Sequence, residues 1–266
     1  MLKATQVGDV TEIKMGRSLD GETVLYWVAA YLIDGILIDT GCDYTKNELA
    51  EFLDGKQVSK LINTHYHEDH VGGNAILAKR FGLKAIAHPE TVRLMSGKHD
   101  LYPFELEVWG PPDPCIADPM GSLIKEGEVS LHVIETPGHC KGHVSLFEGN
   151  HGILFSGDIW VGERPKTART EENVHQLIRD LTKFEELKPK IMFASLGKAV
   201  PNPLDVIRGT REYLEETRDK ILKLHSEGKS PEQIREQLFG RESTLAEYTQ
   251  YQLSIKIFVE SFLRSE

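Results

Sequence analysis

Three histidines and an aspartate crowd into six residues of the stretch NTHYHEDHVGGN, which runs from Asn63 to Asn74. The stretch follows a short apolar run, VSKLINT, and precedes a helical pattern, NAILAKRFG, that Gly82 closes. The cluster is therefore predicted to lie on a loop between a strand and a helix. Because the motif and this context agree, a loop that is histidine-rich by chance is the weaker interpretation.

The spacing inside the cluster suits a divalent metal ion. Residues two apart on an extended backbone point the same way, so His65 and His67 are expected to present their imidazoles side by side. Asp69 and His70, at the start of the following helix, can turn back toward them. Neutral imidazoles and carboxylates are ligands that zinc prefers, at about 2.0–2.2 Å. The sequence therefore predicts a metal site at this loop.

A second metal motif must be distinguished from this one. The run from His67 to His70 resembles a helical HExxH motif but is one residue short, so its two histidines would not share one face of a helix. Glu68 is accordingly expected to face outward rather than to act as a general base.

Strands are expected on both sides of the cluster, where short apolar or alternating runs end at turn signals. These runs are VTEIKMG, TVLYWVAAYLID, GILIDTG, LKAIAHP, VSLHVIETPG, HVSLFEG, HGILFSGD and KIMFASLG. Helices are expected at KNELAEFLDG and at 174–187, where Thr170 is placed to cap the second helix and Pro189 to stop it. The segment 96–120 breaks this periodicity and is predicted to be a long loop.

From Pro203 onward the sequence predicts only helices. Ser230 to Gln233 forms a capping box with Pro231 at the first helical position, and Gly240 ends that helix. The run TLAEYTQYQLSIKIFVESFLRSE predicts one further helix. Acidic and basic residues are nearly balanced in this region, which disfavours a nucleic-acid module and favours shaping substrate access or dimerisation.

Charge and hydropathy exclude several classes of protein. A formal net charge of -10 on 266 residues argues against a general binder of nucleic acid or anionic membranes. No apolar run approaches the roughly 20 residues that span a bilayer, and the first residues lack a secretion signal. Cys42, Cys115 and Cys140 fit neither a disulfide framework nor a cysteine zinc site. We expect a cytoplasmic protein that acts on a small molecule, with no nucleic-acid or membrane partner and with homodimerisation left open.

The cluster resembles the HxHxDH motif of the metallo-β-lactamase superfamily. Two further elements of the family pattern follow in order, TPGHCKGH with His139 and LFSGD with Asp158, and the upstream LIDTG around Asp39 is also typical. The resemblance covers about three-quarters of the chain. It implies an α+β fold of two facing sheets between helices, with the metal at one edge. We divide the chain into a catalytic domain, 1–202, and a helical extension, 203–266.

The resemblance also implies a ligand set, which this sequence completes only in part. One metal site is implied for His65, His67 and His139, and a second for Asp69, His70 and the shared Asp158. The family's last histidine, in a PGHG motif, is replaced: the sequence there is ASLGKAVPNP, with Leu196 in that place.

Three outcomes stay open for the second site. Water takes the vacant place, another histidine such as His175 moves in, or the protein works with one ion. One or two divalent ions are therefore expected, with zinc first and manganese or iron as alternatives, since a carboxylate-rich site suits harder ions. Near the site, His143 is expected to form a supporting hydrogen bond, and Cys140 to be a packed thiol.

The resemblance implies metal-dependent hydrolysis, and relatives of this family cleave thioesters, lactones, β-lactams and phosphodiesters. Because the chain is modest in size and acidic and has no nucleic-acid module, we favour a small thioester, lactone or related ester. Metal-activated hydroxide would attack, and Asp69 would position it and relay its proton. The alternatives are a mononuclear non-haem iron dioxygenase of the persulfide dioxygenase type and a catalytically silent metal-binding protein.

Two loops are expected to contact the substrate. One carries aromatic residues and the other follows the metal aspartate, and the candidates are Tyr102, Phe104, Trp109, Trp160, Arg164 and Lys166. Aromatic side chains beside cations suit an acyl or ring substrate with a carboxylate or phosphate handle.

Overall fold

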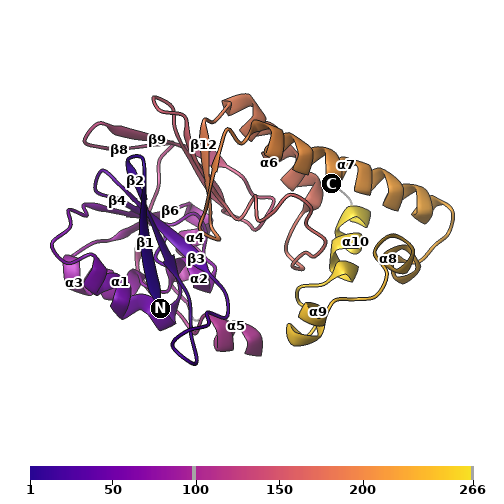
Figure 1. Ribbon diagram of the computed structural model, residues 1–266, viewed down its shortest axis with the longest axis horizontal. Helices are drawn as coiled ribbons and strands as arrows, with labels where there is room; N and C mark the ends of the chain where they lie inside the picture. Colours follow the sequence, from indigo (N-terminus) through magenta and orange to yellow (C-terminus); the bar gives the residue numbers. More distant parts are fainter. Residues whose placement is uncertain (98–99, 265–266) are drawn as a thin grey trace.

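The computed structural model describes residues 1–97 and 100–264 and places two β-sheets face to face between helices (Figure 1). The first sheet has the strand order β1 (Leu2–Val7), β2 (Val10–Met15), β3 (Val28–Ile33), β4 (Ile36–Ile38), β5 (Lys60–Ile62), β6 (Ala85–Ala87), β7 (Ala117–Pro119). The second has the order β13 (Lys198–Pro201), β12 (Ile191–Ala194), β11 (Ile153–Gly157), β10 (Val144–Glu148), β9 (Val129–Glu135), β8 (Leu123–Glu126).

Helices cover the outer face of each sheet. Those on the first sheet are η1 (Asp43–Thr45), α1 (Lys46–Phe52), α2 (Glu68–Val71), α3 (Asn74–Phe81), α4 (Pro89–Met95) and α5 (Pro103–Val108). Those on the second sheet and beyond it are α6 (Val174–Leu187), α7 (Leu204–Ser226), α8 (Pro231–Phe239), α9 (Thr244–Tyr248) and α10 (Ile255–Leu263). The fold class expected from the sequence is therefore confirmed.

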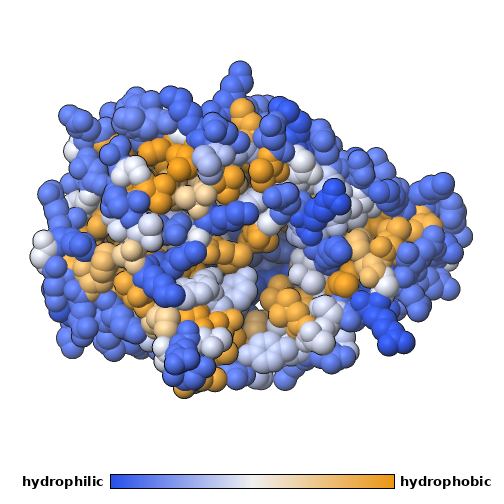
Figure 2. Space-filling model, in the orientation of Figure 1, coloured by the Kyte–Doolittle hydropathy of each residue, from blue (hydrophilic) through white to orange (hydrophobic). Residues whose placement is uncertain are grey.

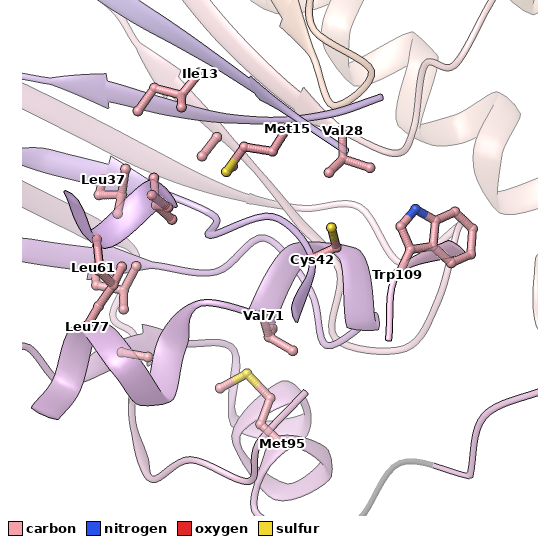
Figure 3. Close-up of a cluster of buried hydrophobic side chains, with 14 of the residues drawn as sticks. Ile13, Met15, Val28, Leu37, Cys42, Leu61, Val71, Leu77, Met95 and Trp109 are labelled. Atoms are coloured by element: carbon pink, nitrogen blue, oxygen red, sulfur yellow. The ribbon is translucent and has the colours of Figure 1, made fainter. Parts of the chain in front are cut away.

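The alternation of side chains along the strands builds the layers. Ile36 and Ile38 point from β4 into the space between the sheets, where they join Phe155 and Phe193 of the second sheet. Leu37, between them, points to the opposite face and packs among the helices. Figure 3 shows this outer cluster, in which Cys42 and Val71 lie between the first sheet and the helices below it. All three cysteines are free thiols, as expected.

Strand direction brings the polar loops to one edge of the sandwich. β4, β5 and β6 run parallel, so the residues after β4 and after β5, Asp39 and His65, leave the sheet on the same side. β11 and β12 are also parallel, which puts Asp158 and Ser195 together at their carboxyl ends. Sites in open sheets form outside the carboxyl ends of parallel strands.

Three predictions about single elements are wrong. The segment 96–120 is not all loop, because its described part contains α5 and β7; Glu105 caps α5 by accepting from the Tyr102 backbone N–H at 2.9 Å. The helix at 174–187 is capped by Asn173, whose side chain accepts from the Gln176 N–H, and not by Thr170.

The third wrong prediction concerns the last helix. A single helix was expected over 244–266, but this run contains two helices, α9 and α10. Positions 265 and 266 of the predicted helix lie outside the described residues. Gln250 and Tyr251, with φ of 50° and 64°, break it. The capping box at Ser230 and the stop at Gly240 are confirmed.

The C-terminal helices pack on the second sheet through one continuous apolar cluster. Met192 of β12, Ile207 of α7 and Phe258 of α10 belong to it, and the Trp160 indole N–H donates to Thr210 Oγ1 of α7 at 3.0 Å. Within the described residues, no helix is both long enough and apolar enough to cross a membrane. The division at residue 202 stays a prediction.

Candidate metal centre

Three histidine nitrogens converge at the edge of the sandwich. His67 Nδ1 lies 3.0 Å from His65 Nε2 and 3.0 Å from His139 Nε2, and all three side chains are buried. Histidine nitrogens bind zinc at about 2.0–2.1 Å, so one ion can reach all three. Burial, reinforced by the neighbouring Arg169, lowers the pKa of His67 to about 3, which keeps this imidazole neutral as a metal ligand requires.

A second group of atoms lies beside the first. His70 Nε2 is 3.2 Å from Asp158 Oδ1 and 3.8 Å from Asp69 Oδ2, while Asp158 Oδ2 is 3.5 Å from His139 Nε2. His70 Nε2 and Asp158 Oδ1 are buried and have no hydrogen-bond partner in the described structure. Buried polar atoms without partners are rare and costly. A cation between them would satisfy both, so these residues fit a metal ion.

The carboxylates of this second group favour a positive charge between them. Burial alone would lower the pKa of His70, but Asp158, Asp69 and Asp39 together raise it well above its usual value. Burial would raise the pKa of Asp158, yet His70 and His139 hold it well below its usual range. In the metal-free protein a proton on His70 supplies positive charge that a divalent cation would supply instead.

A carboxylate behind each of three rings sets its tautomer. Asp39 Oδ2 contacts His70 Nδ1 at 2.8 Å, Glu171 Oε1 contacts His67 Nε2 at 2.7 Å, and Glu172 Oε1 contacts His139 Nδ1 at 2.8 Å. An ionised carboxylate only accepts hydrogen bonds, so each of these nitrogens carries a proton. The opposite nitrogen of each ring then faces the metal position.

Glu171 and Glu172 lie outside every motif that the sequence analysis used. They stand in the loop before α6, more than 30 residues beyond His139 and more than 100 beyond His67. Only the folded chain brings this loop over the cluster. Nearby, Arg169 Nη1 donates to Glu105 Oε1 at 2.9 Å, a pairing that the sequence also did not signal.

The prediction for the side chain of Glu68 is wrong. It was expected to face outward, but its side chain is buried, with 2% of its surface exposed. Its Oε1 lies 3.7 Å from Arg169 Nη2, and this guanidinium offsets part of the cost of burying the carboxyl. Burial, together with the charges of Asp69 and Glu105, raises the pKa of Glu68 to about 8, against the lowering effect of Arg169.

The remaining polar neighbours have defined partners. His143 Nε2 accepts from the Asp158 backbone N–H at 3.0 Å, which confirms a supporting hydrogen bond. His175 Nε2 donates to the Phe262 carbonyl at 3.2 Å, so it does not complete the second group as one alternative supposed. Leu196 is half-buried, and the Oγ of Ser195 beside it is buried without a hydrogen-bond partner in the described structure. Cys140 is buried, and its sulfur lies within 4.8 Å of the nitrogens of the first group.

A pocket of about 430 Å³ opens beside His67. Tyr102 and Phe104 line it, as expected, and Gln252 from the C-terminal extension also contributes. The surface in Figure 2 is hollowed in this region, between the sandwich and the C-terminal helices.

The other four predicted contact residues lie elsewhere. Trp109 packs behind Phe104 with ring centroids 6.1 Å apart, and Trp160 is buried against α7. Arg164 lies by the Tyr213 ring, and neither it nor Lys166 is among the described residues that line the pocket. The chain that follows Asp158 turns toward α7, which is why these cations miss the pocket.

Sequence comparison places this centre in a known family. The family model described as the metallo-beta-lactamase superfamily matches residues 28–195, more than half of the chain. The chain belongs to the metallo-β-lactamase superfamily. Membership implies divalent metal ions, and the histidine–aspartate cluster is positioned to bind them. Which of the six predicted ligands hold metal stays a prediction, although the structure brings all six to one edge.

Relatives within the superfamily are distant. The chain is 30% identical over 158 residues to a hydroxyacylglutathione hydrolase of Chelativorans sp. (strain BNC1), covering 59% of this chain and 49% of that protein. It is 28% identical over 202 residues to a beta-lactamase-like protein 2 homolog of Drosophila melanogaster, covering 70% and 63%. The chain thus spans about half of the length of the first relative and less than two thirds of the length of the second.

Solved structures of metallo-β-lactamase proteins share the fold over nearly the whole chain. A beta-lactamase domain protein from Burkholderia ambifaria aligns with a TM-score of 0.73 at 18% identity, covering 98% of this chain and 88% of that one. A metallo-beta-lactamase family protein from Thermus thermophilus aligns with a TM-score of 0.69 at 18% identity, covering 97% and 94%. Both alignments extend over the C-terminal helices, and at this identity they show the fold alone.

Proposed function

We propose that the protein is a metal-dependent hydrolase of a small thioester, lactone or related ester. The observation that carries this proposal is the pair of adjoining ligand groups, His65, His67 and His139 beside Asp69, His70 and Asp158, next to a pocket of about 430 Å³. Pockets of this size suit small molecules. The relative named hydroxyacylglutathione hydrolase supports hydrolysis as the reaction type.

The chain's own residues have separable roles in this proposal. A divalent metal bound here supplies a Lewis acid that polarises a carbonyl and lowers the pKa of water toward neutrality. Asp69 is buried beside His70, and because burial raises its pKa, its carboxylate is a better proton acceptor for the attacking water. Phe104 and Tyr102 would hold the acyl group at the pocket wall.

A substrate panel with matched variants tests the proposal. A thioester, a lactone, a simple ester and an RNA are offered to the purified protein after its metal content is measured. We expect hydrolysis of at least one of the first three, and its loss in His67→Ala and Asp158→Ala with the far-UV circular dichroism unchanged. His132→Ala, at an exposed position on β9, is the control and should keep full activity. Hydrolysis of RNA alone, or full activity of His67→Ala, would overturn the proposal.

A further inference from the structure

Three buried side-chain atoms beside one another have no hydrogen-bond partner in the described structure. They are His70 Nε2, Asp158 Oδ1 and the Oγ of Ser195. The first two belong to the second ligand group and fit a metal ion. Ser195 is only 2% exposed and lies outside every motif that predicted a ligand. Its unpartnered hydroxyl is therefore the feature of the centre that the predicted ligand set does not explain.

The Ser195 side chain contacts Asp158. β11 and β12 are parallel, and Gly157 of one strand pairs with Ala194 of the other. Asp158 and Ser195 are the next residues along the two chains, so they leave the sheet together. Burial raises the pKa of Asp158, and His70 and the Ser195 hydroxyl are among the groups that lower it. The hydroxyl therefore faces the Asp158 carboxylate, although the two do not form an aligned hydrogen bond.

The three atoms approach one another without satisfying one another. His70 Nε2 lies 3.2 Å from Asp158 Oδ1, which is within hydrogen-bond distance, yet both atoms remain without an aligned partner in the described structure. The same holds for the Ser195 hydroxyl against Asp158. Buried polar atoms without partners are rare and costly, and hydrogen bonds weaken steeply when they are misaligned. One cation bound to all three atoms would satisfy them together.

The backbone holds Ser195 in place without using its side chain. Ser195 is the first residue of the turn 195–197 between β12 and β13, and its carbonyl accepts from the Ala29 N–H of β3 at 2.6 Å. The Tyr31 hydroxyl donates to the carbonyl of Ala194, the residue before it. Main-chain contacts therefore tie the end of β12 to the first sheet, and the Ser195 oxygen stays available to a ligand.

A hydroxyl oxygen also suits the charge of this group. The carboxylates of Asp69 and Asp158 balance a divalent ion, so a further ligand need only be neutral. Serine and threonine hydroxyls bind Mg²⁺ in this way in P-loop NTPases. Two carboxylates, one imidazole and one hydroxyl form an oxygen-rich set, which suits a harder ion such as Mn²⁺ better than three imidazoles do.

We propose that the Ser195 hydroxyl oxygen is a ligand of the second metal ion and that the ion bound there is a hard divalent cation such as Mn²⁺. This arrangement differs from the three that the sequence left open, which were water, His175 or a single ion. Ser195, rather than Leu196 beside it, is then the residue of this turn that completes the centre. The inference rests on the proposed function for the presence of a second ion, and it names a further ligand of that ion.

Binding of Mn²⁺ tests the proposal without any substrate. The full chain is stripped of metal, loaded with one equivalent of Zn²⁺ for the three histidines and titrated with Mn²⁺, whose free ion is followed by electron paramagnetic resonance. We expect the parent protein to bind about one Mn²⁺ per chain. Ser195→Ala should raise the dissociation constant on the order of tenfold, because water replaces the hydroxyl. The affinity for the first Zn²⁺ should not change.

The stability of the metal-free protein separates ligation from a structural role. Ser195→Ala removes a hydroxyl without a hydrogen-bond partner in the described structure, so the metal-free variant should melt no lower than the parent. Ser261→Ala is the matched control, because Ser261 is 1% exposed and its hydroxyl donates to the Phe258 carbonyl at 2.8 Å in α10. This control should melt at a lower temperature and bind Mn²⁺ as the parent does.

A sulfur atom at the same position tests direct contact with the ion. Ser195→Cys should bind Cd²⁺ more tightly relative to Mn²⁺ than the parent does, because thiolates prefer softer ions. It should also gain an ultraviolet charge-transfer band from thiolate to cadmium. The band is measured as the difference from the parent, since Cys140, whose sulfur lies near the first group, is present in both proteins.

The outcomes divide as follows between support and contradiction. Weaker Mn²⁺ binding in Ser195→Ala with unchanged Zn²⁺ affinity, together with the added band in Ser195→Cys, supports the proposal. Unchanged Mn²⁺ binding, an equal loss of Zn²⁺ binding, an equal loss in Ser261→Ala, no second ion in the parent or no added band overturns it. Hydrolysis of the substrate panel is measured separately, and a lack of turnover with Mn²⁺ bound through Ser195 overturns only the hydrolase proposal.

Discussion

At the scale of single residues, the site depends on protons that the carboxylates hold in place. Asp39, Glu171 and Glu172 each accept a hydrogen bond from one nitrogen of a histidine, which leaves the other nitrogen free for metal. Asp39 is itself fixed, because the Thr64 backbone N–H and hydroxyl both donate to it at 2.8 Å. The orientation of the rings is therefore built in before any metal binds.

Removing one of these carboxylates should weaken metal binding without changing the ligands. Glu172→Ala leaves His139 Nδ1 without its partner at 2.8 Å, so the ring is free to rotate and to change tautomer. We expect metal affinity to fall about 10–100-fold, as is typical for such partners, in competition with a chromophoric chelator. Glu163→Ala, an exposed glutamate in the same loop, is the control. Equal affinities of the two variants would contradict this role for Glu172.

Site residues could be predicted from the sequence only where they lie close to one another along the chain. His65, His67, Asp69 and His70 form one local motif, so their grouping was readable before the fold was known. Glu171 shows no such signal, since its partner His67 is 104 positions away and only the packing of the loop before α6 brings them together. The prediction that Glu68 faces outward is wrong for the same reason, because its half-buried partner Arg169 is also about 100 positions away in sequence.

At the scale of elements, the turn that ends β11 depends on the glycine at position 157. Gly157 has φ of 53°, and a Cβ added there would come within 2.4 Å of His143 Nε2. His143 is the residue that accepts the Asp158 N–H. A glycine is therefore required both by the backbone conformation and by the close approach of the imidazole.

Two glycine variants separate these requirements. Gly157→Ala and Gly8→Ala both place an L-residue at positive φ, 53° and 57°, but the Cβ at Gly8 meets nothing within 4 Å. Gly8→Ala should lower the free energy of unfolding by about 1 kcal/mol through backbone strain alone. Gly157→Ala should lower the free energy of unfolding by clearly more than Gly8→Ala does. It should also weaken metal binding, because His143 must move. Equal losses in urea denaturation, with metal affinity unchanged, would show that His143 yields freely.

The strands that the sequence did not predict share one property: they lie at the edges of the sheets. β1 and β7 end the first sheet, and β13 and β8 end the second. An edge strand buries little, and β1 is exposed over most of its length, so it carries no apolar run to detect. The central strands, such as β4 and β11, are fully buried, and their short apolar runs predicted them from the sequence.

At the scale of the whole molecule, the C-terminal helices belong to the same core as the second sheet and also reach the pocket. Ala168 and Ser254 form a β-bridge that ties the loop carrying Glu171 to the start of α10, and Gln252 lines the pocket. The extension therefore packs into the same core as the second sheet and supplies a residue of the pocket wall, and the Ala168–Ser254 bridge connects it to the loop that carries Glu171.

A core variant tests whether the extension unfolds with the sandwich. Phe258 of α10 is 2% exposed and packs against Phe239 and Phe262. Phe258→Ala should cost about 3–5 kcal/mol and lower the temperature of one cooperative transition of the whole chain in calorimetry. Leu245→Ala, at an exposed position on α9, should change little. Two separate transitions, with only one of them shifted, would instead indicate an independent C-terminal domain.

Metal binding should be linked to protons across the whole centre. In the metal-free protein Asp158, Asp69 and Asp39 raise the pKa of His70 well above its usual value although burial opposes this, so its Nε2 carries a proton near pH 7 that metal must displace. Binding should therefore release protons, and affinity should fall as the pH is lowered from 7.5 to 6, because protons then compete better. Titration calorimetry in two buffers of different ionisation enthalpy measures the release, and chelation should lower the melting temperature in parallel. Proton release that His70→Ala does not reduce would contradict this origin, since Asp158 is already ionised before metal binds.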